Sequence, residues 1–176
     1  MEAEFYEIII KGNHRSGVLY ESPRCPEVRI DDAAEIQNWK DFEFELRDGC
    51  YCPYNMGPGC SRIVTKEFKD LLLTFVPPHF EMEFLPVKVL SKEYGDKECY
   101  ILHFTKIFDV MDKEHTIYSG NVILKIRLDY EKTKSLNMFN TQPFINDFIV
   151  SRTVRDAIKK EKLDFGIEFC PIFYGE

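Results

Sequence analysis

The sequence predicts an α+β fold, in which a largely antiparallel sheet carries two principal helices. Three observations predict this fold. Segments with period-two alternation or many aromatic and β-branched residues recur along the 176-residue chain. Only two segments have the apolar spacing of a longer amphipathic helix. The length suits a single domain over 1–176, with an acidic, loop-rich part at 1–60 and a second part at 61–176.

The expected strands are rich in residues that fit a pleated, half-buried surface. The clearest alternation places Phe42, Phe44 and Leu46 on one face and acidic side chains on the other. Pro86 marks its strand as an edge strand or a bulge, because proline cannot donate a ladder hydrogen bond. The predicted strands span 4–10, 41–47, 80–90, 99–108, 122–130 and 167–173.

Both principal helices begin at a residue suited to capping. Thr65 precedes a helix whose core-facing positions are Phe68, Leu71 and Leu72, and which ends before Pro77. Ser151 precedes a helix that reaches about residue 162 and faces the core with Val154 and Ile158. Asp31 and Asp32 favour a further short helix to about residue 37. Glycine, proline or polar residues predict loops at 11–30, 48–60, 109–120 and 131–141.

Two segments of the chain align with each other. The residues at 63–72 match those at 149–158 without gaps, and those at 82–87 match those at 167–172. Each segment contains a Ser/Thr cap, a charged helix and a strand with the pattern Glu-Phe-x-Pro-apolar. A proline at the same strand position argues against chance similarity. The alignment predicts an internal helix–strand repeat with units at 63–90 and 149–173.

The same stretches carry a family resemblance. They are the segment from Ile63 to Val87, the segment from Tyr100 to Glu114, and the C-terminal segment from Phe148 to Ile172. Over roughly 63–172 the chain resembles a family of bacterial proteins regarded as immunity proteins of polymorphic-toxin systems. The resemblance implies a cytoplasmic protein that binds and neutralises a partner toxin, without catalysis and without a cofactor. It implies no particular contact residues.

The negative charge is concentrated near the N-terminus. The net charge is −7, and residues 1–48 hold 12 acidic and 6 basic residues, a difference of −6. Such a balance disfavours nucleic acid and suits a basic partner. In the strand at 41–47, Asp41, Glu43 and Glu45 form an outward row, which makes these three residues the candidate contacts with a toxin. The alternative is a row that only keeps the sheet face hydrated.

A different class of function would use His103 with Asp109 and Asp112 as a hydrolase-type acid–base site. Two carboxylates close to a histidine can transfer protons. The structural alternative is that the aspartates bond their own backbone in a turn, and that the strand histidine is a packed residue. We favour this structural alternative, and therefore predict that the protein is not an enzyme.

The cysteines offer a third possibility. Cys50, Cys52 and Cys60 lie in one loop and, with Cys25 or a histidine, could hold zinc in a metal-stabilised binding module. The spacing differs from the usual C-x2-C half-site, so we expect free thiols in a reducing cell and no metal. Neither a secretory signal nor an apolar run of about 20 residues is present, which favours a cytoplasmic protein without a membrane partner.

Overall fold

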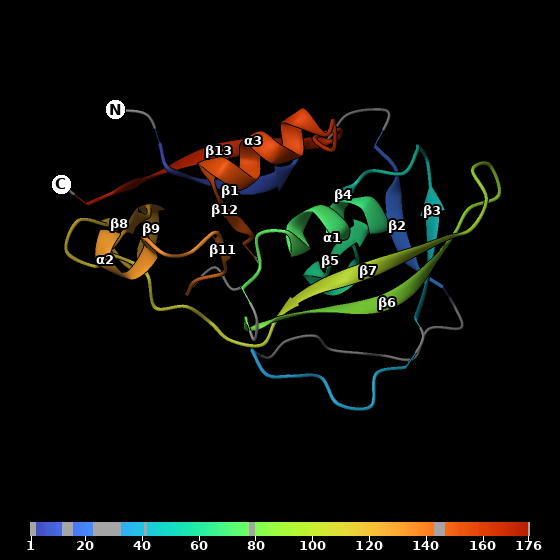
Figure 1. The fold of residues 1–176 in the computed structure, drawn as a ribbon, viewed down its shortest axis with the longest axis horizontal. Coiled ribbons are helices and arrows are strands. Elements are labelled where there is room, and N and C mark those ends of the chain that lie inside the picture. Colours follow the sequence, from blue (N-terminus) through green and yellow to red (C-terminus); the bar gives the residue numbers. More distant parts are fainter. Residues whose placement is uncertain are drawn as a thin grey trace.

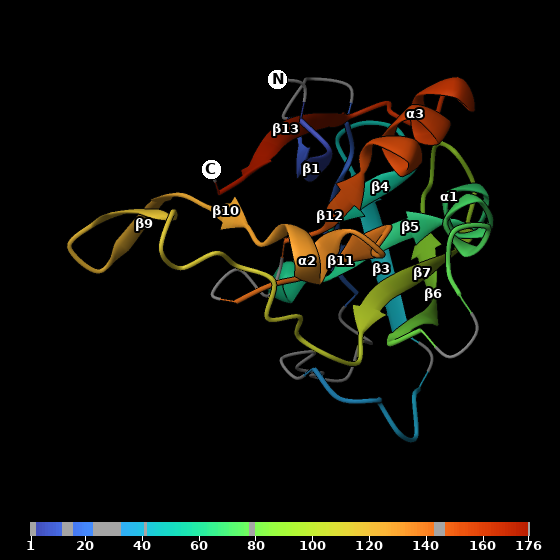
Figure 2. The ribbon, with the colours of Figure 1, turned by 60° about the vertical axis from the view of Figure 1, so that its left-hand side comes forward.

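The computed structural model describes residues 3–11, 16–22, 33–40, 42–77, 80–142 and 147–175. Within these ranges the chain forms a six-stranded sheet, a five-stranded sheet, a two-stranded sheet and three α-helices (Figures 1 and 2). The fold is therefore α+β-like and mostly sheet.

The helices are α1 Lys66–Leu73, α2 Tyr130–Thr133 and α3 Arg152–Lys160, and a 3-10 turn, η1, spans Pro58–Cys60. The strands are β1 Phe5–Ile10, β2 Val18–Glu21, β3 Phe42–Arg47, β4 Tyr54–Met56, β5 Arg62–Thr65, β6 Met82–Leu90, β7 Lys97–Phe104, β8 Ile117–Ser119, β9 Val122–Lys125, β10 Arg127–Leu128, β11 Met138–Phe139, β12 Ile149–Ser151 and β13 Ile167–Tyr174.

Both larger sheets are mixed, which corrects the expectation of a largely antiparallel sheet. The six-stranded sheet has the order β2-β3-β6-β7-β5-β4, and its β3–β6 pair is parallel. The five-stranded sheet has the order β10-β13-β1-β12-β11, and its β10–β13 pair is parallel. Parallel pairs arise because β3 and β6, like β10 and β13, are joined by long connections rather than by hairpins.

Five strands of each sheet follow one plan. The β3-β6-β7-β5-β4 part of one sheet and the whole β10-β13-β1-β12-β11 sheet each begin with a parallel pair and continue with three antiparallel pairs. The central strand comes from different places in the sequence. It is β7, after α1, in the first sheet, and β1, near the N-terminus, in the second.

Both principal helices begin as predicted. The Thr65 side chain accepts a hydrogen bond from Phe68 N, and Ser151 accepts one from Val154 N. These bonds satisfy a backbone donor that the first turn of a helix leaves unpaired. Phe68, Leu72, Val154 and Ile158 are fully buried, as predicted, while Leu71 is only partly buried. The helix α1 ends at Leu73, earlier than Pro77 alone would require.

The main core lies where α1 and α3 meet both larger sheets (Figure 1). Tyr54, Phe104 and Phe148 belong to an aromatic cluster with ring centroids about 6 Å apart. A second core covers the other face of the six-stranded sheet, where Trp39 and Tyr51 pack over Phe42 and Val89. The indole nitrogen of Trp39 donates to the Pro86 carbonyl at 2.8 Å.

Several local expectations fail for tertiary reasons. The predicted loops contain β2, β4, β8, α2 and β11. Residues 33–37 form bends and turns rather than a helix, and Asp31 and Asp32 lie outside the described residues. The predicted strand at 122–130 is divided between β9 and β10, and Val122 and Leu124 are each 64% exposed. The hairpin formed by β8 and β9 projects beyond both larger sheets, so its alternation has no core to face (Figure 2).

Pro86 occupies an internal strand, contrary to the prediction of an edge strand or bulge. The strand β6 pairs with β7 on one side, where Pro86 lies opposite Tyr100. On the other side its pairing with β3, within the described residues, includes Val87 opposite Phe42.

Candidate functional site

The helix α1 covers only one half of the sheet face on which it packs. It contacts β5 and β7, and no helix of the described residues covers the part of the same face formed by β2, β3, β6 and the beginning of β7 (Figure 1). We call this part the open face. It comprises the side chains of Tyr20, Glu43, Glu45, Arg47, Lys88 and Glu98, which the strand register places on one side of the sheet. The open face carries two of the three predicted contact residues.

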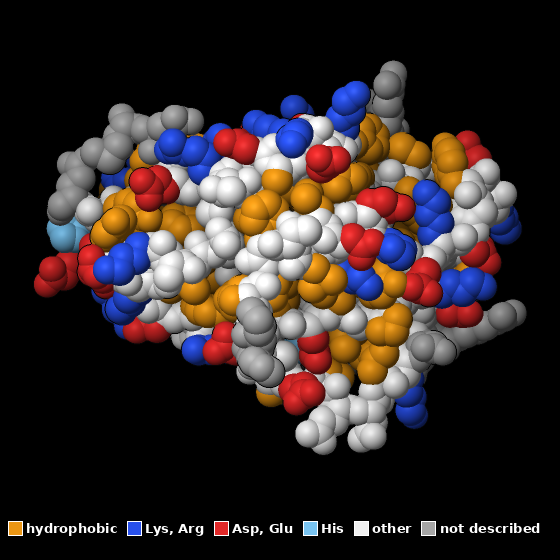
Figure 3. Space-filling view, viewed as in Figure 1, with side chains coloured by type: hydrophobic (Ala, Val, Ile, Leu, Met, Phe, Trp, Pro, Cys, Tyr) orange, Lys and Arg blue, Asp and Glu red, His pale blue; other side chains and the backbone are white. Residues whose placement is uncertain are grey.

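Charges of both signs alternate across the open face, and Figure 3 shows acidic and basic side chains interspersed over this part of the molecule. Lys88 lies between Glu43 of β3 and Glu98 of β7, because it is the register partner of both. Its ammonium group nevertheless pairs with Asp96, with Nζ 3.1 Å from Oδ2. That hydrogen bond lowers the pKa of Asp96. The ammonium group of Lys88 thus forms its ion pair with Asp96.

The two described carboxylates of the predicted row differ in their surroundings. Glu45 Oε2 accepts a hydrogen bond from Arg47 Nη2 at 2.6 Å, and the Arg47 guanidinium also lies over the Tyr20 ring at 4.7 Å. Glu43, by contrast, has one buried oxygen, Oε2, with no hydrogen-bond partner among the described residues. Asp41, the third member of the row, lies outside the described residues.

A cavity of about 380 Å³ opens beside Glu43. Its walls come from β3, β6 and β7, and they combine charged groups with apolar surface. The lining residues are Glu43, Pro86, Val87, Lys88, Asp96, Lys97 and Glu98. An elongated side chain with a charged end fits such a mixed lining, because its apolar stem can pack while its end is paired.

The structure gives the proposed acid–base residues separate partners. His103 is 3% exposed, and its Nδ1 lies 2.8 Å from Glu83 Oε1, which also accepts from the Ile36 N–H. Asp112 instead lies 2.8 Å from His115 Nδ1 and accepts from two backbone N–H groups in a turn. Burial raises the pKa of Asp112, but the hydrogen bonds from His115 outweigh it and the pKa is lowered.

Asp109 is highly exposed and pairs with Lys132 at 3.3 Å and with Lys113 at 3.9 Å. Of the two aspartates, only Asp112 bonds backbone N–H groups in a turn, as the structural alternative expects, whereas Asp109 pairs with lysine side chains. The histidine that pairs with Asp112 is His115, and not the predicted His103. The three-residue spacing from Asp112 was a usable signal for this pair.

The cysteine loop is described only in part. Cys52 is a buried free thiol, and burial raises its pKa. No group of three or more metal-ligating side chains occurs among the described residues. Cys25 and the side chain of Cys60 lie outside what the structure describes, so the metal-site alternative is not tested at those positions.

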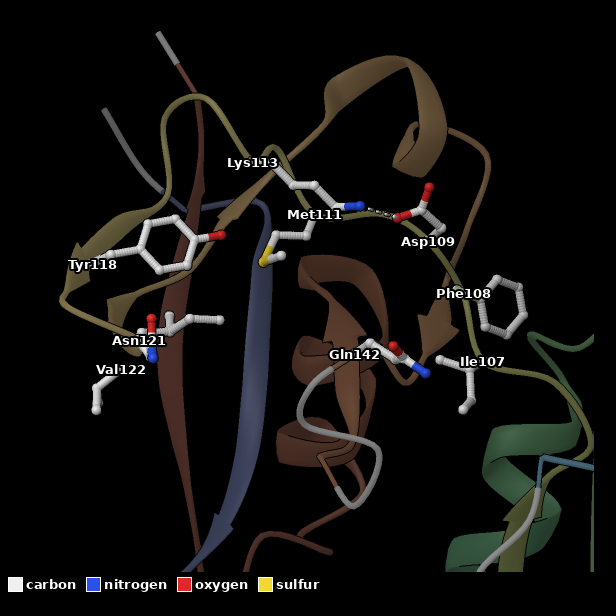
Figure 4. A pocket seen from close by; sticks show the side chains of 10 residues that line it. Ile107, Phe108, Asp109, Met111, Lys113, Tyr118, Asn121, Val122 and Gln142 are labelled. Atoms are coloured by element: carbon white, nitrogen blue, oxygen red, sulfur yellow. Dashed lines mark ion pairs between the residues drawn. The ribbon is translucent and has the colours of Figure 1, made fainter.

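A larger groove, of about 840 Å³, lies between the β8–β9 hairpin and the segment that follows β7 (Figure 4). Tyr118 and Val122 line it from the hairpin, and Ile107 and Phe108 line it from the opposite side. Figure 4 shows the Asp109–Lys113 ion pair at its upper end. Nothing in the sequence patterns indicated this groove, because it depends on how the hairpin folds back beside the segment that precedes it.

A buried polar cluster joins the two larger sheets. Arg62 of β5 is 7% exposed, and its Nη1 donates to the Asp147 carbonyl, just before β12, at 3.0 Å. Burial raises the pKa of the Asp147 carboxyl to about 7, with a further contribution from Glu7, while Arg62 opposes the shift. The cluster ties β5 to β12 within the core, away from the open face.

Comparison with models of known protein families finds no match to this chain, and comparison with curated proteins finds no similar sequence. No helix within the described ranges has the length and apolar character needed to cross a membrane.

Proposed function

We propose that this protein is an immunity protein, which binds a cognate bacterial toxin and neutralises it by occlusion rather than by catalysis. The observation that carries the proposal is the open face, an exposed sheet surface with charged groups and an incompletely paired carboxylate. Surfaces of this kind suit recognition of a charged protein partner. The resemblance over 63–172 supports the same function, and the partner is expected to be basic.

The proposed protein acts in the cytoplasm as one domain and holds no cofactor. Its contacts with the toxin come from Asp41, Glu43 and Glu45. The main core supports the proposal of one domain, because side chains from both larger sheets pack in it. Such a scaffold would hold the open face rigid, and a rigid surface loses less conformational entropy when it binds.

The internal repeat belongs to this proposal as well. The units at 63–90 and 149–173 are proposed to be copies of one helix–strand unit. The matching strand order of the two larger sheets supports this idea, as do the equivalent caps at Thr65 and Ser151. The aligned prolines also face equivalent residues, because Pro86 lies opposite Tyr100 and Pro171 lies opposite Tyr6.

Growth protection tests the proposed function. The protein encoded directly beside this chain would be expressed under an inducible promoter, with and without this chain in the same cells. Toxicity that this chain relieves, together with a stable complex of the two purified proteins, is the expected result. A neighbour that is harmless alone, or that stays toxic when this chain is co-expressed and folded, would contradict the proposal.

A further inference from the structure

We propose that Glu43 anchors a lysine or arginine side chain of the partner, which enters the cavity between β3, β6 and β7. This inference rests on the proposed function for the identity of the partner. It goes further by assigning one carboxylate of the predicted row as the binding group. The chemistry of the occupant is a cationic head on an apolar stem.

Glu43 and Glu45 differ in their partners. The two residues lie on one strand and point to one face, but Glu45 already pairs with Arg47 at 2.6 Å. Glu43 Oε2 is buried and accepts no hydrogen bond within the described structure. A buried acceptor without a donor is unfavourable, and binding that supplies a donor removes this cost.

The lysines that line the cavity with Glu43 already contact other groups. Lys88 is the register neighbour of Glu43 but pairs with Asp96 at 3.1 Å. Lys97, which also lines the cavity, lies over the Tyr51 ring with its Nζ 4.4 Å from the ring centroid. A donor for Glu43 can therefore come from a partner without breaking these two contacts.

The size and lining of the cavity suit a long cationic side chain. Its volume of about 380 Å³ is ample for a single long side chain. Pro86 and Val87 supply apolar surface for the methylene stem, and Glu98 supplies a second carboxylate on the far strand. The lining carries three carboxylates and two ammonium groups, so its balance favours a cation over an anion.

The test uses a small probe, so it does not require the toxin. The probe is the blocked tripeptide acetyl-Gly-Arg-Gly-amide, titrated into the whole protein at low salt. Binding is followed through the carboxyl carbon resonances of labelled glutamates. The expected result is a saturable shift at Glu43 with little change at Glu45, weakened by added salt. The same peptide with glutamate in place of arginine is expected not to bind.

Glu43→Gln is the test variant, and Glu168→Gln, at an exposed position on β13 of the other sheet, is its control. Glu43→Gln should weaken probe binding about tenfold or more, as expected for loss of a charge-assisted hydrogen bond. Glu168→Gln should change it less than about twofold, because Glu168 is exposed and does not line the cavity. Thermal unfolding of both variants checks that the fold is retained. The shifts of the glutamate carboxyl resonances in the wild-type protein locate the probe without the use of either variant.

Equal weakening by both variants, a probe that shifts other glutamates, or the absence of saturable binding would overturn the assignment of Glu43. These outcomes concern only the cation site. A failure of the proposed function is detected separately, by the growth experiment. Probe binding at Glu43 without growth protection keeps the cation site and rejects the toxin as its partner.

Discussion

The Lys69 ammonium lies over the ring of Tyr100, with Nζ 3.5 Å from the ring centroid. A corresponding contact occurs between Arg155 of α3 and Tyr6 of β1, at 4.1 Å. The two cations occupy aligned positions, four residues after Thr65 and Ser151. Each tyrosine lies in the central strand of its sheet, opposite a proline. Cation–π contact thus holds each helix to the central strand of its sheet.

Replacing either cation should therefore lower the stability of the protein, and Arg155→Met also removes an exposed ion pair with Asp156. Lys69→Met and Arg155→Met are each expected to lower the free energy of unfolding by about 0.5–1 kcal/mol, because methionine keeps the apolar stem and loses the charge. Urea denaturation measures the change. Lys160→Met, on the exposed side of α3, is the control and should lie within about 0.5 kcal/mol of the wild type. An unchanged stability in both test variants would contradict the prediction.

Adjacent leucines of α1 provide a second test. Leu72 is fully buried, whereas Leu73 is 47% exposed. Leu72→Ala should lower the free energy of unfolding by about 2–5 kcal/mol, because it removes buried methyl groups and leaves a cavity. Leu73→Ala should cost no more than about 1 kcal/mol. The two variants have the same chemical change on one helix, so similar losses would show that the α1 core face is wrongly assigned.

The caps of the two principal helices offer a third comparison. Thr65→Ala and Ser151→Ala each remove the acceptor of an N-terminal backbone N–H. Each is expected to reduce the free energy of unfolding by about 1 kcal/mol. Chemical denaturation checks the values, and Thr74→Ala at the other end of α1 serves as a comparison. A loss for one cap alone would argue against equivalent roles in the two units.

Local patterns predicted these parts of the fold well. These features depend on residues that are close together in sequence. They are the helix caps, the buried positions of both principal helices, and the alternation of Phe42, Phe44 and Leu46. Long-range pairing was not accessible in the same way. The insertion of β1 between β12 and β13, and the parallel β3–β6 pair, depend on contacts between distant segments. Short strands such as β11 carry too few residues for a pattern.

The candidate site shows the same division. Alternation identified Glu43 and Glu45 as outward residues of one strand, on a face that the structure leaves open. It could not distinguish them, because the Arg47 partner of Glu45 and the unpartnered oxygen of Glu43 are properties of side-chain conformation. The cavity beside Glu43 needs three strands that come together only in the sheet. A sequence pattern along β3 alone contains no such information.

The buried cluster between the sheets predicts a pH dependence of stability. The pKa of Asp147 is raised to about 7 from an ordinary value of 3.8, mainly by burial. The folded state therefore binds a proton between about pH 4 and 7 that the unfolded state has lost. Stability from this group is greatest at low pH and is lost as pH rises through about 7. Burial also raises the pKa of Glu7, which acts in the same direction.

Asp147→Asn should remove this dependence. Relative to the wild type, the variant should gain stability as pH rises from 4 to 8, by about 1–2 kcal/mol after allowance for partial exposure of the carboxyl. Urea denaturation at several pH values measures the difference. Asp164→Asn, at an exposed position, is the control and should show a small, constant difference. A difference between the Asp147→Asn variant and wild type that does not change with pH would contradict the assignment.

The last prediction concerns the rate at which the proposed partner associates. Reversal of Asp41, Glu43 and Glu45 to lysine changes the charge of one strand face by six units. If a basic toxin binds there, the association rate at low salt should fall by about tenfold or more, because charged rows accelerate encounter. The effect should shrink at high salt, where screening shortens the range of the charges.

Stopped-flow mixing of the two purified proteins measures this rate, and unfolding curves confirm that the variant is folded. A control variant with the same total charge change replaces three acidic residues around α3 by lysine. They are Asp156, Glu161 and Asp164, and they are remote from the open face in sequence. An equal fall with the control would indicate an effect of net charge alone. An unchanged rate at low salt would leave the acidic row with only a role in hydrating the sheet and discouraging edge-to-edge pairing.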